Sequence, residues 1–188
     1  MTDIFKDFIT ELAKVNKKDM DRIMSCINTY KVKRNTIILS QGEICSHYYF
    51  LEKGCMRTYY VTKEGLEKTR LISFDNTPVT ALTSFITQKP SLEYIDALED
   101  SELLSISQTD FFMLLDEIPS WALFYRKNLE LAFAFQNSRI EDLVTLSAKE
   151  RYEKLLKEQP HYIRRLSNRV VATYLGISQE TLSRLKSK

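Results

Sequence analysis

The stretch Asn168–Lys186, NRVVATYLGISQETLSRLK, decides the fold of the C-terminal part of this 188-residue chain. Ser167 stands directly before it as a helix N-cap, and Gly176 stands where a first helix would end with a positive φ. Ser178 caps a second helix, which we expect to span Gln179 to Lys186. The residues expected to fix the crossing of the two helices are Val171, Leu175, Ile177, Leu182 and Leu185, with the small Ala172 at the close approach. A helix, a short turn and a second helix at these offsets predict a helix-turn-helix.

Positive charge is concentrated around this motif. Residues 161–188 contain six basic residues and one acidic residue, Glu180, for a net charge of +5, whereas the whole chain carries +2. The residues before them therefore carry −3. Such a local excess favours a polyanionic partner, and together with the helix-turn-helix it predicts binding to double-stranded DNA. The alternative is a ligand-binding or interaction module whose helical hairpin is only structural, and such a hairpin would not need this charge.

The exposed face of the second helix supplies the candidate DNA contacts. In the major groove, Gln can pair with adenine, Arg with guanine, and Glu with the amino group of cytosine. We expect the bases to be contacted by Gln179, Glu180, Ser183 and Arg184. The hydroxyls and cations that are better placed for phosphates are Ser178, Thr181, Arg169, Lys186 and Lys188.

Short β-branched and aromatic runs alternate with turn-prone breaks between Lys31 and Ser107. The expected strands are Thr36–Leu39, Tyr48–Leu51, Met56–Val61, Thr69–Phe74, Tyr94–Ala97 and Leu103–Ile106. We expect Asp75–Pro78 to be one of the turns between them. This pattern predicts an antiparallel barrel or jelly roll, preceded by helical segments in the first thirty residues.

A long helix is expected to follow the strands, because Ser120–Leu146 contains neither Gly nor Pro and follows Pro119. At 1.5 Å per residue its length would be about 40 Å. Its apolar face must pack against the β-rich domain of the chain or against a second copy of the helix, and the pattern leaves both open. Ser147 and Glu150 form a capping box that begins the next helix.

The fold class that we expect is therefore α+β. It comprises an N-terminal antiparallel β-roll or jelly-roll domain over residues 1–118, a long connecting helix over 119–146, and a helix-turn-helix domain over 147–188.

Residue types that metal and redox sites need are sparse. The cysteines are Cys26, Cys45 and Cys55, without a CxxC pair, so we expect buried thiols and no metal or cofactor. We expect no enzyme and no catalytic residue, because no nucleophile–base pattern or phosphate loop is present. The sequence has no apolar run of about 20 residues and no signal-like N-terminus, so we expect a cytoplasmic protein without a membrane partner.

The order of a β-rich domain, a long helix and a helix-turn-helix resembles the Crp/Fnr superfamily, typified by the cyclic-AMP receptor protein. The resemblance covers nearly the whole chain. QGEICSHYYFLEKG at Gln41–Gly54 is similar to the hairpin segment of the family's cyclic-nucleotide-binding-like domain, and SQETLSRLK at Ser178–Lys186 is similar to its recognition helix. The resemblance implies a transcription regulator that binds DNA as a homodimer and uses its long helix for dimerisation. It also implies RNA polymerase and an unidentified small-molecule effector as further partners.

The sequence departs from this family at three places. Gln179 stands where many members have Arg, which changes the expected operator sequence. The family's cyclic-nucleotide cassette contains Gly-Glu-Leu and later Arg-Ser or Arg-Ala, whereas this chain has Thr80, Ala81 and Leu82 at the first motif and Ser91 and Leu92 at the second. Because the ribose-binding carboxylate and the phosphate-binding guanidinium are missing, we expect this degenerate pocket not to bind cyclic AMP. The family's β-hairpin wing is also missing after the recognition helix, and we expect this ending to be natural.

Overall fold

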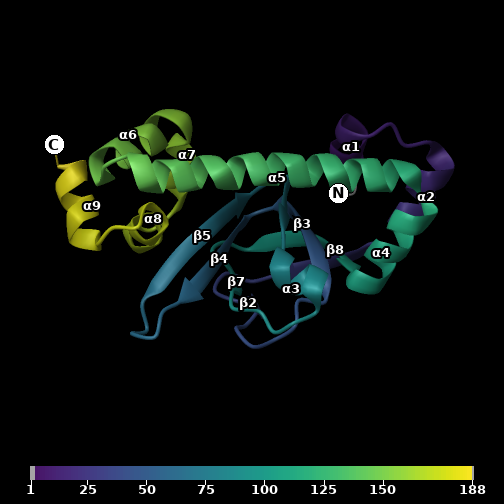
Figure 1. Ribbon diagram of the computed structural model, residues 1–188, viewed down its shortest axis with the longest axis horizontal. Coiled ribbons are helices and arrows are strands. Elements are labelled where there is room, and N and C mark those ends of the chain that lie inside the picture. The colour runs from purple at the N-terminus through teal and green to yellow at the C-terminus, as the bar shows by residue number, and fades with distance from the viewer. Residues whose placement is uncertain (1–2, 188) are drawn as a thin grey trace. The chain divides into compact units, whose positions relative to one another are not determined.

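The computed structural model describes residues 3–187, which form two compact units (Figure 1). The N-terminal unit comprises Met1–Thr58 and Ile72–Leu131, and the C-terminal unit comprises Tyr59–Leu71 and Ala132–Lys188. One long helix, α5 (Pro119–Thr145), contributes its first half to the N-terminal unit and its second half to the C-terminal unit.

The strands of residues 3–187 form two four-stranded sheets, with the orders β1-β8-β3-β6 and β2-β7-β4-β5. The strands are β1 (Asn28–Val32), β2 (Ile37–Leu39), β3 (His47–Lys53), β4 (Cys55–Val61), β5 (Glu67–Phe74), β6 (Thr77–Val79), β7 (Tyr94–Ala97) and β8 (Ser101–Ser107). The pairs β1–β8, β3–β8, β3–β6 and β2–β7 are all antiparallel. The predicted α+β class with an antiparallel β-roll is therefore confirmed.

All six expected strands are present, but two further strands have no counterpart in the prediction. Strand β1 pairs with β8 from Asn28 opposite Ser105 to Val32 opposite Ser101, although the first four residues of β1 are exposed. Strand β6 is the edge strand beside β3, and its Pro78 lies opposite Phe50. The expectation of a turn over the whole of Asp75–Pro78 is therefore wrong at its end. An edge position tolerates proline because no second strand needs its missing N–H.

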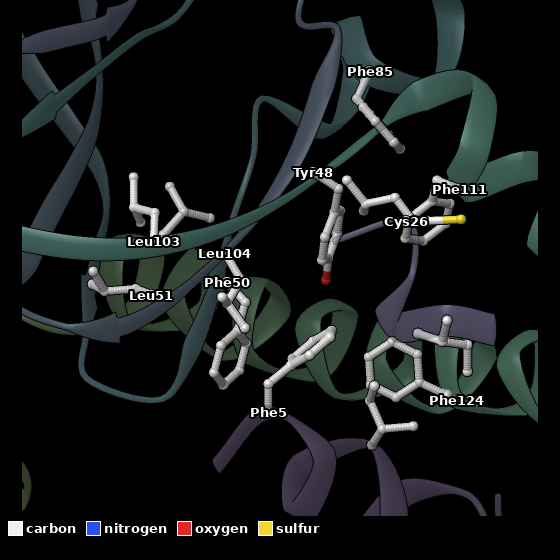
Figure 2. Close-up of a cluster of buried hydrophobic side chains, with 14 of the residues drawn as sticks. Phe5, Cys26, Tyr48, Phe50, Leu51, Phe85, Leu103, Leu104, Phe111 and Phe124 are labelled. Carbon is white, nitrogen blue, oxygen red and sulfur yellow. The ribbon is translucent and has the colours of Figure 1, made fainter. Parts of the chain in front are cut away.

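Aromatic side chains from distant parts of the chain form the core of the N-terminal unit (Figure 2). The helices of this unit, besides α5, are α1 (Asp3–Leu12), α2 (Lys17–Met24), α3 (Leu82–Thr87) and α4 (Gln108–Glu117). Phe5 of α1 packs against Phe50 of β3 with ring centroids 5.0 Å apart. Phe111 of α4 packs against Trp121 of α5 at 5.1 Å, and the Trp121 indole N–H donates to the Phe111 carbonyl at 3.2 Å. These contacts attach the first half of α5 to the β-roll.

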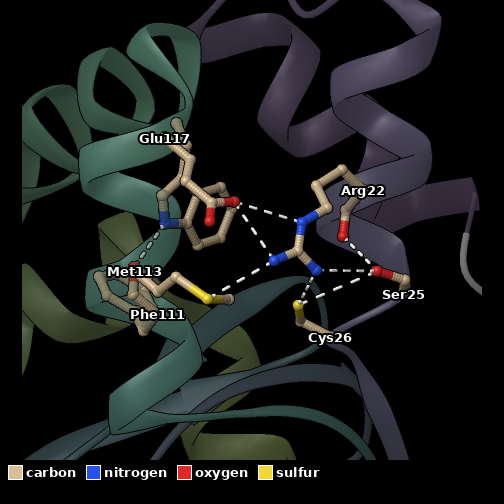
Figure 3. Close-up of polar contacts among 7 residues, drawn as sticks. Arg22, Ser25, Cys26, Phe111, Met113 and Glu117 are labelled. Atoms are coloured by element: carbon tan, nitrogen blue, oxygen red, sulfur yellow. Dashed lines mark hydrogen bonds and ion pairs between the residues drawn. The ribbon is translucent and has the colours of Figure 1, made fainter.

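The guanidinium of Arg22 joins α2 to α4 (Figure 3). Its Nη2 atom lies 3.2 Å from Glu117 Oε2 and donates to the Met113 sulfur at 3.5 Å. Its Nη1 atom donates to Cys26 Sγ at 3.4 Å and to Ser25 Oγ at 3.5 Å. Cys26 thus contacts the same guanidinium that reaches Glu117 of α4. It is buried, as are Cys45 and Cys55, and the expectation of buried thiols is confirmed.

Four shorter helices follow α5 in the C-terminal unit and lie near its C-terminal end (Figure 1). They are α6 (Ala148–Glu158), α7 (Pro160–Arg165), α8 (Asn168–Leu175) and α9 (Gln179–Lys186). The predicted capping box is present, since the Ser147 hydroxyl accepts from the Glu150 N–H and the Glu150 carboxylate accepts from the Ser147 N–H. The sequence reading did not anticipate α7, which begins at Pro160.

The two halves of α5 differ in what they expose. Trp121 and Phe124 in its first half are fully buried in the N-terminal core. Its second half leaves large apolar side chains in solvent: Phe133 is 69% exposed, Ile140 57% and Val144 79%. These three residues lie at spacings of seven and four and form one stripe along the helix, which we call the α5 stripe.

Candidate nucleic-acid interface

Helix α8 begins and ends as its sequence predicts. The Ser167 hydroxyl accepts from the Val170 N–H at 3.3 Å. Gly176 adopts φ +71° at the end of the helix, and the next residue, Ile177, donates its N–H to the Ala172 carbonyl at 3.0 Å. A left-handed residue at this position favours glycine and turns the chain toward α9. Val171, Ala172 and Leu175 are buried, as the helix-turn-helix layout requires.

Helix α9 exposes polar side chains and buries Leu182. Ser178 caps it by accepting from the Thr181 N–H at 3.2 Å, and Leu182 on the opposite face is fully buried. The predicted contact residues Gln179, Glu180, Ser183, Arg184 and Lys186 are all exposed, and Thr181 is half-buried. Ser178 is exposed as well, whereas Lys188 lies outside the described residues. The structure therefore leaves the predicted residues of α9 accessible, apart from the half-buried Thr181.

Two of these side chains are held by contacts within the helix. The Arg184 guanidinium donates to Thr181 Oγ1 at 3.2 Å, one turn earlier. A hydrogen bond from Ser178, with smaller contributions from a backbone N–H and from Arg184, holds the pKa of Glu180 below its ordinary value. Glu180 is thus ionised at neutral pH and can accept from an exocyclic amine.

Arg169 lies at the first turn of α8 and already has an acidic partner. Its Nη2 atom is 2.7 Å from Glu67 Oε1 on β5, within the C-terminal unit. Lys186 donates to the amide oxygen of Asn168, so this predicted phosphate contact also lies at the start of α8. Two of the three cations that we expect to contact phosphates, Arg169 and Lys186, therefore flank the same helix N-terminus.

Two arginines that the sequence analysis did not single out donate hydrogen bonds to the backbone at the end of α8. Arg139 of α5 lies over the Tyr174 ring, 3.7 Å from its centroid, and donates to the Tyr174 carbonyl at 3.0 Å. Arg151 of α6 donates to the Leu175 carbonyl at 3.2 Å and to the Leu146 carbonyl at 2.6 Å. These bonds satisfy carbonyls at the ends of α8 and α5. No sequence signal could reveal them, since Arg139 and Tyr174 are 35 positions apart.

The residues of the degenerate pocket belong to the N-terminal unit and make local contacts. Ala81 is buried directly before α3, and Thr80 and Leu82 are half-buried beside it. The Ser91 hydroxyl is engaged with Glu93, donating to its carbonyl at 3.0 Å and accepting from its N–H at 2.9 Å. Leu92 is 69% exposed. Since none of these side chains carries a charge, they do not fit an anionic cyclic phosphate.

A buried ion pair lies elsewhere in the β-roll, between β4 and β7. Arg57 donates to Asp96 through two nitrogens on one edge of its guanidinium, with Nε–Oδ1 at 3.0 Å and Nη2–Oδ2 at 2.7 Å. Their side chains are 7% and 13% exposed. This fork geometry is the strongest kind of ion-pair contact. The Asp96 carboxylate thus neutralises the buried Arg57 guanidinium.

Residues 30–117 match the family model of the cyclic nucleotide-binding domain. Similar solved structures include FixK2 from Bradyrhizobium japonicum, with a TM-score of 0.74, 16% identity, and coverage of 86% of this chain and 83% of that chain. A putative transcriptional regulator of the Crp/Fnr family from Eubacterium rectale has a TM-score of 0.73 at 22% identity, covering 91% and 82% of the two chains. No curated protein sequence matches this chain.

A third structure, the c-di-GMP-responsive global regulator CLP of Xanthomonas campestris, has a TM-score of 0.73 at 14% identity and covers 92% of this chain and 90% of its own. The chain thus shares its fold with these three solved structures. The order of elements on which the resemblance to the Crp/Fnr superfamily rests, a β-rich domain followed by a long helix and further helices, is thus shared with these solved structures.

Residues 3–187 offer neither a membrane-spanning helix nor a metal-binding cluster of side chains. Every helix in this range falls short of the length or apolar character needed to cross a membrane. The same residues contain no group of three or more His, Cys, Asp or Glu side chains that could hold a metal ion.

Proposed function

We propose that this chain is a sequence-specific DNA-binding transcription regulator of the Crp/Fnr type. The single observation that supports this most is α9, a helix capped by Ser178 whose exposed face gathers Gln179, Glu180 and Arg184. Polar side chains of these types match the donor and acceptor pattern of base edges in the major groove. The surrounding segment carries the chain's excess of basic residues, which suits the phosphate backbone.

In this proposal the protein acts as a homodimer, and the α5 stripe forms the seam, that is, the interface between the two subunits. A stripe that includes Phe133 and Val144 at 69% and 79% exposure is unfavourable in water. Pairing two such stripes about a two-fold axis would bury them and place two recognition helices about 34 Å apart, one turn of duplex. The target is then a near-palindromic site, which selection from random duplexes would identify.

Arg184→Ala should weaken binding to the selected site by about 5- to 150-fold, which corresponds to about 1–3 kcal/mol. It should also relax the preference at one base pair, because a bidentate contact to guanine is lost. Fluorescence anisotropy on the selected duplex and on its single-base variants measures both effects. Lys186→Ala is the matched control, since a lost phosphate contact weakens every duplex about equally. Equal weakening of all duplexes by both variants would show that Arg184 does not contact bases.

The proposal does not include control by cyclic AMP. A cyclic phosphate must be paired and hydrogen-bonded when it leaves water, yet Ser91 offers one neutral hydroxyl that Glu93 already engages. Ala81 has no acceptor for the ribose. Titration calorimetry with cyclic AMP and cyclic GMP should therefore show no saturable binding, and micromolar binding would mean that other residues form the nucleotide site.

A further inference from the structure

The outer part of the β4–β5 hairpin contacts α8 through two polar pairs within the C-terminal unit. Glu67 Oε1 lies 2.7 Å from Arg169 Nη2, and the hydroxyls of Thr69 and Thr173 lie 2.6 Å apart. Residues two apart in a strand point to the same side, and residues four apart in a helix share a face. One side of β5 is therefore matched to one face of α8, and we call these four residues the hairpin latch.

The threonine pair has a defined direction. Thr173 donates its hydroxyl hydrogen to the Val170 carbonyl at 2.9 Å, as helical threonines commonly do. Because a hydroxyl has one hydrogen, Thr69 donates to Thr173 in the pair. Thr69 is buried, so this bond is shielded from water. It fixes the position of β5 along α8 and thereby brings Glu67 opposite Arg169.

The charged pair of the latch uses a side chain that DNA would also use. Arg169 stands in the first turn of α8, beside Asn168 and its partner Lys186, and is 62% exposed. Its guanidinium can form the same charge-assisted hydrogen bonds with a carboxylate or with a phosphate. A phosphate at this place would also lie close to the Glu67 carboxylate and be repelled by it. Latch and duplex therefore compete for Arg169.

We propose that the hairpin latch is an autoinhibitory contact, in which Glu67 occupies Arg169 and must release it when the helix-turn-helix engages a phosphate backbone. This inference rests on the proposed function. It makes the hairpin a regulatory element of DNA affinity, since any change that moves β5 away from α8 increases affinity. By linkage, bound DNA opens the latch to the same extent.

Glu67→Gln tests the charged pair because it removes the carboxylate charge and keeps the side-chain size. We expect about 3- to 10-fold tighter binding to the selected duplex at constant salt. We also expect the slope of log K against log salt to steepen by up to about 0.9, the contribution of one additional phosphate contact. Glu64→Gln is the matched control, since it removes the same charge from the exposed turn of the same hairpin without touching Arg169. In an Arg169→Gln background, Glu67→Gln should have no effect beyond that of the control.

Thr69→Val tests the latch without a change of charge and should also tighten binding, by about 2-fold. Hydrogen exchange without DNA provides a second measurement, in which both latch variants should exchange faster at residues 66–71 than the parent and Glu64→Gln. If Glu67→Gln binds no tighter than Glu64→Gln while the parent protein binds DNA, the latch proposal is wrong and the proposed function stands. If no variant binds any duplex, including those whose exchange shows an open latch, the proposed function is wrong and the autoinhibition fails with it.

Discussion

Asp96→Ala should destabilise the protein by about 3–5 kcal/mol, because it removes the carboxylate that accepts two hydrogen bonds from the buried Arg57 guanidinium. The parent pair is bidentate, and the two side chains are only 7% and 13% exposed. Water therefore cannot replace the lost charge without opening the sheet between β4 and β7. Urea unfolding followed by circular dichroism measures the change in the free energy of unfolding.

Two comparisons make this expectation specific to the buried pair. Glu130→Ala removes one side of the exposed Arg126–Glu130 pair on α5 and should cost less than about 1 kcal/mol. The double variant Arg57→Met/Asp96→Leu replaces both charges with apolar groups and should recover much of the stability. An Asp96→Ala variant no less stable than Glu130→Ala would contradict the role given to the pair.

Phe133→Asp should convert the proposed homodimer into a monomer and weaken binding to the full palindromic site by about 10³-fold, because one half-site no longer assists the other. An aspartate in a closed seam would be a buried charge without a partner, and the exposed stripe indicates that the monomer itself tolerates the substitution. Analytical ultracentrifugation gives the association state, and anisotropy on full and half sites gives the affinities.

Ala134→Asp is the matched control for this seam. Ala134 is the next residue of α5, is exposed, and lies about 100° around the helix from Phe133. The Ala134→Asp substitution introduces the same charge outside the α5 stripe and should leave the dimer intact. A parent protein that is monomeric at micromolar concentration and protects a single half-site would rule out the proposed assembly.

Local signals explain why the helix-turn-helix could be predicted from the sequence. Ser167, Gly176 and Ser178 act on backbone groups within a few positions of themselves, so their residue types reveal the ends of α8 and α9. Six of the strands were equally readable, because their β-branched and aromatic runs are continuous. The edge strands β1 and β6 were not: β1 is mostly exposed, and β6 contains Pro78.

The contacts that define the rest of the site could not be predicted, because they join residues far apart in the chain. Arg57 and Asp96 are 39 positions apart, and Glu67 and Arg169 are 102 positions apart. Each of these residues alone resembles an ordinary polar position of a strand or helix. From the sequence we expected Arg169 at a phosphate. Only the folded structure shows that its guanidinium is already paired with the Glu67 carboxylate.

The arginine bonds at the end of α8 have a consequence for the spacing of DNA half-sites. Because Arg139 and Arg151 fasten α8 to the second half of α5 and to α6, the recognition helix follows any rotation of that half. In the proposed dimer each recognition helix lies about 17 Å from the two-fold axis, half of one duplex turn. A change of about 10° in the crossing of the two α5 helices would displace it by about 3 Å, close to the 3.4 Å rise of one base pair. Substitutions in the α5 stripe could therefore change the preferred operator length without altering any residue that contacts DNA.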